Sequence, residues 1–452
     1  MSAFDARGLA VSAEDPPALL LYEAALHSLH GARGDAAART AAALARDPNL
    51  VAAYCLRAAA LVLAGSPTAN AQLATTLQVL DDLAARANDR ERRHASAARA
   101  WLDGDVALAL ERYGALVVDY PRDSLALQVA LGIDFRLGQR EMLRDRVAEV
   151  LPHWDASVPG YGYVLGMYAF GLEENGDYER AEATAREALR AEPDNAAAIH
   201  VIAHVMEMQG RAREGVEWLE STREVWASNA GFSTHLAWHL SLFHIDLGAT
   251  PQALSIYVDT LAPRAASTTN ALIDATALLW RLELRGVHVR GLWRALANHW
   301  GRTSLSGERA FTLVHALLAF AAAGVPHLAA RVAKLLKNDA ATRTANTAQD
   351  LALAIPLAEG LQAYGRGDYA AAVDRITAVR AAAYRCGGSI AQCDLIHLTL
   401  IEAALRAQRA RLALALASER AARKPDSPLN RWLCAHAEFG AWQDRTRVAA
   451  SA

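Results

Sequence analysis

The chain has 452 residues, of which 53% are hydrophobic and 21% charged, and a formal net charge of −3. One hydrophobic core stops growing at about 250 to 300 residues, so this length predicts several domains or one extended repeat array. Acids and bases are interspersed without a basic stripe that could neutralise phosphates, which argues against nucleic acid as a partner. No apolar run reaches the roughly 20 residues that a bilayer span needs, so no membrane partner is expected.

The N-terminal segment and the cysteines together predict a cytoplasmic protein. Residues 1–17 lack the basic region and the apolar region of a signal peptide. The cysteines do not show the C-x-x-C spacing of zinc and redox sites, and we expect free, buried thiols. These cysteines are Cys55, Cys386, Cys393 and Cys434. A reducing location follows.

Small residues recur at fixed offsets from the N-terminus onward, in a chain dominated by alanine and leucine. Segment 17–50 has Ala24, Gly31, Ala36 and Pro48 at the positions that a 34-residue helix-turn-helix repeat uses. The same offsets recur in 90–123. Looser units fill the intervals, so the first half of the chain is predicted to contain repeats at 17–50, 51–84, 90–123 and 124–157.

The clearest repeat is 162–195. Its small residues Ala169 and Ala181 allow two helices to approach, Gly176 makes the turn between them, and Pro193 follows the end of the second helix. The same frame continues through 196–229 and 230–263, looser repeats run to residue 425, and 426–452 should form a capping helix. The sequence therefore predicts an all-α fold, a single continuous α-solenoid of tetratricopeptide-like helix-turn-helix repeats over 1–452.

Five segments together resemble the bacterial branch of the tetratricopeptide repeat protein 38 family. They are SVPGYGYVLGMYAFGLEENGDYERAE, HVIAHVMEMQGRAREGVEWLE, HLAWHLSLFHIDLG, DATALLWRLELRG and FTLVHALLAFAAAG. The resemblance covers nearly the whole chain and implies a helical groove, but it implies no particular reaction. Leu236, Ala237 and Cys393 depart from the family pattern, which suggests that the ligand of this chain differs.

Paired histidines on consecutive helices are the main candidate site. His200 and His204 are four residues apart and therefore share one face of a helix, with Glu207 three residues further along it. His235 and His239 repeat the device on the next inward-facing helix. Because adjacent helices pack about 8 to 10 Å apart, the four imidazoles are expected to converge in one concave pocket. His244 and Asp246 should lie nearby.

Three interpretations of this cluster remain open. Neutral imidazoles are good ligands for a divalent transition metal such as zinc or iron, and the spacing of four lets one helix supply two ligands. The cluster could instead bind a metal-free polar ligand, or could form a structural seam between helices. The pattern is neither H-E-x-x-H nor the E-x-x-H of di-iron bundles. No phosphate loop or dinucleotide fingerprint occurs, so no nucleotide cofactor is expected.

Other side chains on neighbouring helices complete the predicted pocket. Those expected to bind the ligand are Tyr163, Phe170, Glu173, Asp274, Trp280 and His315. By contrast, the charges of the segment WRLELRG are expected on a solvated face.

Two functions are compatible with these residues. The favoured one is a ligand-binding or catalytic pocket, in a metal-dependent hydrolase or an oxygen-dependent enzyme that acts on a small molecule. Glu207 would be its general base and His244 a second catalytic group. The alternative is a non-enzymatic scaffold that binds a peptide or a partner protein in its concave groove. The inward positions lack the Lys, Arg and Asn that bind acidic C-terminal peptides.

Overall fold

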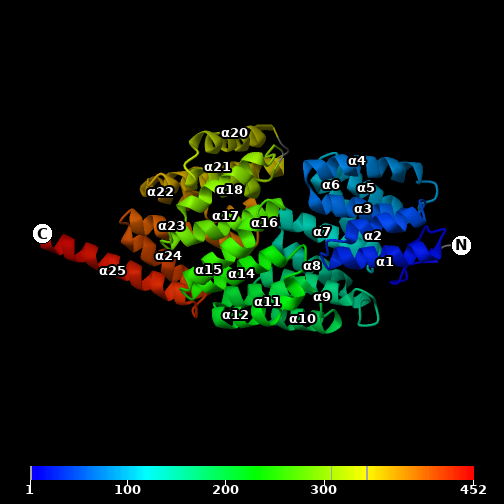
Figure 1. Ribbon diagram of the computed structural model, residues 1–452, viewed down its shortest axis with the longest axis horizontal. Helices are drawn as coiled ribbons and strands as arrows, with labels where there is room; N and C mark the ends of the chain where they lie inside the picture. The colour runs from blue at the N-terminus through cyan, green and yellow to red at the C-terminus, as the bar shows by residue number, and fades with distance from the viewer. Residues whose placement is uncertain (1–2, 307, 343–344, 452) are drawn as a thin grey trace. The chain divides into compact units, whose positions relative to one another are not determined.

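The computed structural model describes residues 3–306, 308–342 and 345–451. Helices follow one another as hairpins whose two members lie side by side (Figure 1). In the described ranges, strands occur only as a short antiparallel pair, β1 (Ala3–Phe4) with β2 (Ala10–Val11). The predicted all-α solenoid is confirmed. None of the helices within these ranges combines the length and the hydropathy that a bilayer span requires.

The chain divides into two compact units. The first comprises Met1–Ile202 and Glu224–Ser233, and the second comprises Ala203–Arg223 and Thr234–Ala452. The division passes through α11, which is one continuous helix. That the whole chain behaves as a single cooperative array stays a prediction.

The first unit is a run of hairpins that occupy the segments predicted as repeats. Its helices are α1 (Pro16–His30), α2 (Ala36–Arg46), α3 (Val51–Ala64), α4 (Pro67–Asp82), α5 (Asp89–Leu102), α6 (Val106–Asp119), α7 (Ser124–Arg136), α8 (Arg140–Val150), η1 (Leu151–His153), α9 (Tyr161–Glu174), α10 (Tyr178–Ala191), the first half of α11 (Ala196–Gln209) and α13 (Arg223–Trp226).

The second unit continues the same pattern with more irregular spacing. It contains the second half of α11 and α12 (Ala212–Ser221), α14 (Ser233–Asp246), α15 (Thr250–Ile256), the π-helix η2 (Tyr257–Leu261), α16 (Ala262–Arg264), α17 (Thr269–Leu284), α18 (Arg290–Arg302), α19 (Ala310–Ala322), α20 (Pro326–Thr342), α21 (Ala345–Gly365), α22 (Tyr369–Val379), η3 (Ala383–Cys386), α23 (Ile390–Arg406), α24 (Ala410–Arg423) and α25 (Pro428–Ser451).

Glycines close the turns between paired helices. Gly176 follows α9 with φ 81° and Gly210 follows α11 with φ 75°. In this left-handed conformation the chain reverses while the last carbonyls of the helix accept backbone hydrogen bonds, as Leu172 does from Asp177. The last hairpin uses Gln408 with φ 58° in the same place. The turn chemistry thus fixes where each first helix stops.

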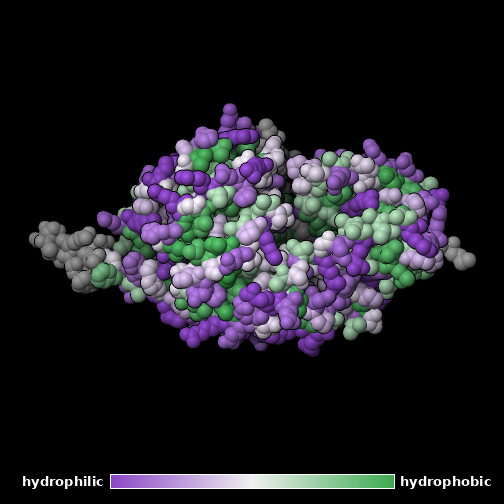
Figure 2. Space-filling view, viewed as in Figure 1, coloured by the Kyte–Doolittle hydropathy of each residue, from purple (hydrophilic) through white to green (hydrophobic). Residues whose placement is uncertain are grey.

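Small residues set the distance between neighbouring helices. Ala181, Ala185 and Ala188 are fully buried on the inner face of α10, while its outward face is hydrophilic (Figure 2). At Gly171 on α9, a Cβ atom would lie 2.3 Å from the backbone oxygen of Leu143 on α8. Close backbone packing of this kind leaves no room for a larger side chain and holds each hairpin in one orientation.

Distant segments of the second unit meet at the ends of α11 and α14. The hydroxyl of Ser427, in the turn between α24 and α25, hydrogen-bonds the Asp246 carboxylate at the end of α14. A Cβ atom added to Gly210 would lie 2.8 Å from the backbone nitrogen of Ser427. The turn between α24 and α25 is therefore held against the C-terminal ends of α11 and α14.

Candidate functional site

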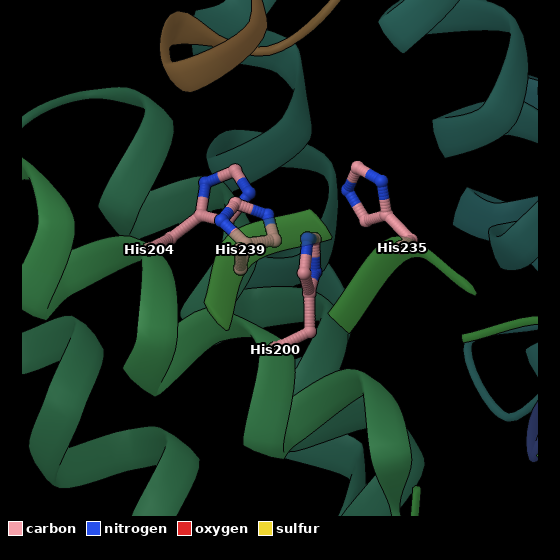
Figure 3. Close-up of side chains that lie close together, drawn as sticks. All are labelled: His200, His204, His235 and His239. Atoms are coloured by element: carbon pink, nitrogen blue, oxygen red, sulfur yellow. The ribbon is translucent and has the colours of Figure 1, made fainter. Parts of the chain in front are cut away.

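Three of the four predicted histidines lie together in the second unit. One ring nitrogen from each of His204, His235 and His239 lies within 4.8 Å of the other two. Figure 3 shows these rings gathered between α11 and α14. The helical spacing places His235 and His239 on one face of α14, one turn apart, as expected. His200 lies on α11 one turn before His204 and belongs to the first unit.

His239 is the centre of the cluster. Its ring centroid lies 4.6 Å from that of His204 and 4.8 Å from that of His235. The side chain is fully buried, and Nδ1 donates a hydrogen bond of 2.9 Å to Oε2 of Glu207 on α11. This contact fixes the orientation of the ring and leaves Nε2 as the nitrogen with which His239 can bind an ion.

His235 repeats this arrangement with a different carboxylate. Its Nδ1 donates a 2.9 Å hydrogen bond to Oδ2 of Asp274 on α17, and its ring stacks on the indole of Trp238 at 5.2 Å between centroids. The His235 side chain is 20% exposed, whereas His204 and His239 are fully buried. His235 is therefore the member of the cluster nearest to solvent.

The environments of these two rings shift their pKa values in opposite directions. Burial, followed by the neighbouring rings of His204 and His235, holds the pKa of His239 well below its ordinary value. Burial also disfavours the charged form of His235, but the Asp274 carboxylate outweighs it and raises the pKa of that ring. His239 is consequently a neutral imidazole at physiological pH, the form that binds a metal ion.

His200 has an aromatic environment. Its ring lies 6.2 Å from the ring of Phe170 on α9 and 5.4 Å from that of Phe232. Phe170 also contacts Phe135 at 5.7 Å. The aromatic rings restrict His200 to one side of α11, the side on which His204 lies one turn later. Phe170, predicted to bind the ligand, therefore packs against a candidate ligand side chain.

The separation of the ring nitrogens is compatible with a single ion. Ligand nitrogens about 2.1 Å from zinc stand no more than about 4.2 Å apart. The nitrogens of His204, His235 and His239 lie within 4.8 Å of one another, which is close to that limit.

A second group of possible ligands lies in the first unit, where Tyr163 is found. His27, Glu192 and Asp194 converge there within the same 4.8 Å limit. Arg33 already donates to the Asp194 carboxylate and lies 3.0 Å from His27 Nε2. The Tyr163 hydroxyl lies 3.4 Å from that same nitrogen. A guanidinium among the donors makes this group a poor cation site.

Three predicted residues have other partners. Trp280 donates from its indole nitrogen to the Thr399 hydroxyl, and His315 donates to the backbone oxygen of Phe311 beside a separate apolar cavity. His244 is half-buried, with the Glu220 carboxylate as its charged neighbour. Asp274, from the predicted ligand-binding set, hydrogen-bonds the clustered His235.

Sequence reasoning missed a charged cavity that shares Glu207 with the cluster. Its wall includes Arg281, Asp394, Arg420 and Lys424. Arg281 belongs to the segment WRLELRG, for which a solvated face was expected, and that expectation is wrong because the residue is only 2% exposed. Lys424 lies more than 200 positions from Glu207, and no periodic pattern connects the two.

No protein-family model matches the chain. Among solved structures it is similar to the human IFIT1 dimer with m7Gppp-AAAA, at 14% identity over 96% of each chain, with a TM-score of 0.43. A monomeric IFIT1 mutant with Gppp-AAAA gives 14% identity over 95% of this chain and 96% of that chain, with a TM-score of 0.44. The TPR domain of P58(IPK) gives 13% over 87% and 98%, with a TM-score of 0.20. A function for the chain therefore has to come from the chemistry of its own site.

Proposed function

We propose that α11 and α14 bind one divalent transition-metal ion, zinc or iron, through His204, His235 and His239 of the second unit. The observation that favours a metal over a structural seam is the pair of carboxylates behind the rings. Glu207 holds His239 and Asp274 holds His235, each at Nδ1 and each at 2.9 Å. Histidines that ligate metals typically donate their second ring nitrogen to a carboxylate in this way.

Charge balance supports the same proposal. Because His239 is neutral, the negative charge of Glu207 is not cancelled by its own hydrogen-bond partner, and Glu207 is only 9% exposed. Its ion pair with Lys424 is long, at 3.9 Å, and a buried carboxylate is costly unless it is closely paired. A divalent ion on the opposite nitrogens would offset the charges of Glu207 and Asp274 together. Glu207 then orients a ligand, a role that replaces the general base expected from the sequence.

A divalent ion bound here supplies Lewis-acid chemistry, polarising a carbonyl or activating a water molecule. The partial exposure of His235 gives a small molecule a route to the ion, while the buried rings hold it in place. Hydrolysis and oxygen-dependent chemistry are both open to such a site. Membership of the tetratricopeptide repeat protein 38 family remains a prediction from the segments quoted above.

Zinc titration of untagged, EDTA-treated protein by calorimetry tests the proposal. Wild type should bind one zinc ion, and Glu207→Gln or Asp274→Asn should each weaken binding by about 10- to 100-fold, because each loses the carboxylate that orients a ligand. Glu217→Gln is the matched control, since Glu217 is an exposed carboxylate on α12. If wild type binds no zinc or ferrous ion, the scaffold function is favoured instead. Equal zinc affinities in wild type and all variants would show that the two carboxylates do not orient the histidine ligands.

A further inference from the structure

The charged cavity beside Glu207 has a volume suited to a small polar group. It occupies about 30 Å³ and lies wholly within the second unit. A site of this size holds about two water-sized groups. Three basic and three acidic side chains line it, namely Arg281, Arg420, Lys424, Glu207, Asp246 and Asp394.

Most of these charges are already matched. Arg420 pairs with the Asp394 carboxylate and also donates a 2.6 Å hydrogen bond to Oδ1 of Asn430. Asp246 accepts from the hydroxyl of Ser427. These contacts satisfy one basic and two acidic residues of the wall without a ligand.

Lys424 and Arg281 are different. The Lys424 side chain is 7% exposed, and its ion pair with the Glu207 carboxylate is long, at 3.9 Å, which is beyond hydrogen-bond distance. Arg281 is buried and donates only to backbone oxygens, those of Ala277, Ala391 and Gln392. Among the described residues, its guanidinium has no carboxylate within salt-bridge distance. Among the described residues, neither cation donates a hydrogen bond to a carboxylate, so both retain donors for a ligand.

We infer that this cavity binds the carboxylate of a small organic acid, with Lys424 and Arg281 as the recognising cations. A carboxylate has two acceptor oxygens, which match the two water-sized volumes, and an ammonium has three donors to offer them. A phosphate is larger and more highly charged, and the carboxylates of Glu207 and Asp394 in the wall disfavour it. No histidine lines the cavity, so the site does not depend on a bound metal.

The cavity also gives the proposed metal function a substrate class. Glu207 lies in the cavity wall and holds His239, so an acid anchored by Lys424 extends toward the histidine cluster. A molecule with a carboxylate at one end and a reactive group at the other would then present that group to the ion. This extension rests on the proposed function, whereas carboxylate binding itself does not.

Thermal unfolding of the EDTA-treated full-length protein in sodium formate, compared with sodium chloride at equal ionic strength, tests the inference. Saturating formate should raise the Tm of wild type by about 2 to 4 °C, because a ligand that binds only the folded state stabilises it. Lys424→Met should abolish this shift, and it should melt below wild type in chloride because it leaves the buried Glu207 carboxylate without its ion-pair partner. Lys334→Met, at an exposed lysine of α20, should retain the shift.

Other outcomes would overturn the inference. These are the absence of a formate-specific shift in wild type, an equal shift in Lys424→Met, and an equal or larger shift with inorganic phosphate. If Lys424→Met does not fold, Lys424→Gln replaces it with the same criteria. Because the metal is stripped with EDTA and the EDTA is removed before melting, failure of metal binding leaves the expected formate result unchanged, so the two proposals fail separately.

Discussion

Histidines in this protein are held in contrasting environments, and the contrast decides what each can do. His239 and His30 are both buried, but His239 donates to a carboxylate while His30 lies between two neutral groups. A histidine whose ring donates to a carboxylate is suited to bind a cation through its other nitrogen. Neutral partners suit an imidazole that remains uncharged and serves the packing of the first unit.

His30 should make the first unit sensitive to acid. Its ring nitrogens contact Gln128 Oε1 and Ser124 Oγ, each at 2.9 Å, and burial together with the Arg7 charge lowers its pKa to about 4. The unfolded chain has the ordinary pKa of about 6.5 and therefore binds more protons between pH 6.5 and 4. Stability is complete above pH 6.5 and falls through this window, by on the order of 3 kcal/mol once pH is below 4.

Urea unfolding of wild type and His30→Gln at several pH values checks this expectation. The variant should lose part of the decline in unfolding free energy between pH 6.5 and 4, because glutamine does not titrate there. His288→Gln, at an exposed histidine, should follow wild type. Parallel curves for wild type and His30→Gln would show that His30 is not responsible.

At this scale the sequence predicted the histidine pairs but not all their neighbours. A spacing of four residues places two rings on one face of a helix regardless of the rest of the fold. Asp274 and Trp280 were both assigned to the pocket, yet six residues turn a helix by about 240°, so both cannot face the same cluster. In the structure, Asp274 accepts a hydrogen bond from His235, whereas Trp280 donates one to Thr399.

Between elements, the decisive feature is the small residue at each helix contact. Ala181→Leu or Ala188→Leu would force three extra carbons into the fully buried seam between α9 and α10. We expect a loss of about 1 to 3 kcal/mol from overpacking, measured as a lower midpoint of thermal or urea unfolding. Ala183→Leu, on a less buried position of α10, is the control. Unchanged midpoints for the buried variants would show that this seam tolerates larger side chains.

The elements themselves were largely predictable because turn glycines and buried alanines mark them in the sequence. The helix α9 begins one residue before the predicted segment 162–195, α10 falls within that segment, and α11 and α12 fall within 196–229. The frame is less regular afterwards. A π-helix, Tyr257–Leu261, interrupts the second helix of the following hairpin, and later turns recur at intervals longer than 34 residues. The local sequence pattern does not indicate where such insertions occur.

On the scale of the whole molecule, contacts between distant segments were not predictable. In the first unit, the Asn229 side chain donates to the backbone oxygen of Gly31, 198 positions earlier. In the second unit, Ser427 reaches Asp246 across 181 positions. Repeat offsets describe how each hairpin packs on the next, but not the curvature that brings the ends of a run together. The charged cavity depends on that curvature and was therefore missed.

The central claim is that the histidine cluster binds a metal ion, and elemental analysis of untagged protein tests it most directly. Protein purified without chelators should contain about one zinc or iron ion per chain, because three converging imidazoles are enough to hold an ion that keeps one position open. The double variant His204→Ala with His239→Ala should contain none, while His288→Ala should match wild type. Wild-type protein without stoichiometric metal, and without uptake when zinc or ferrous ion is added, would contradict the account.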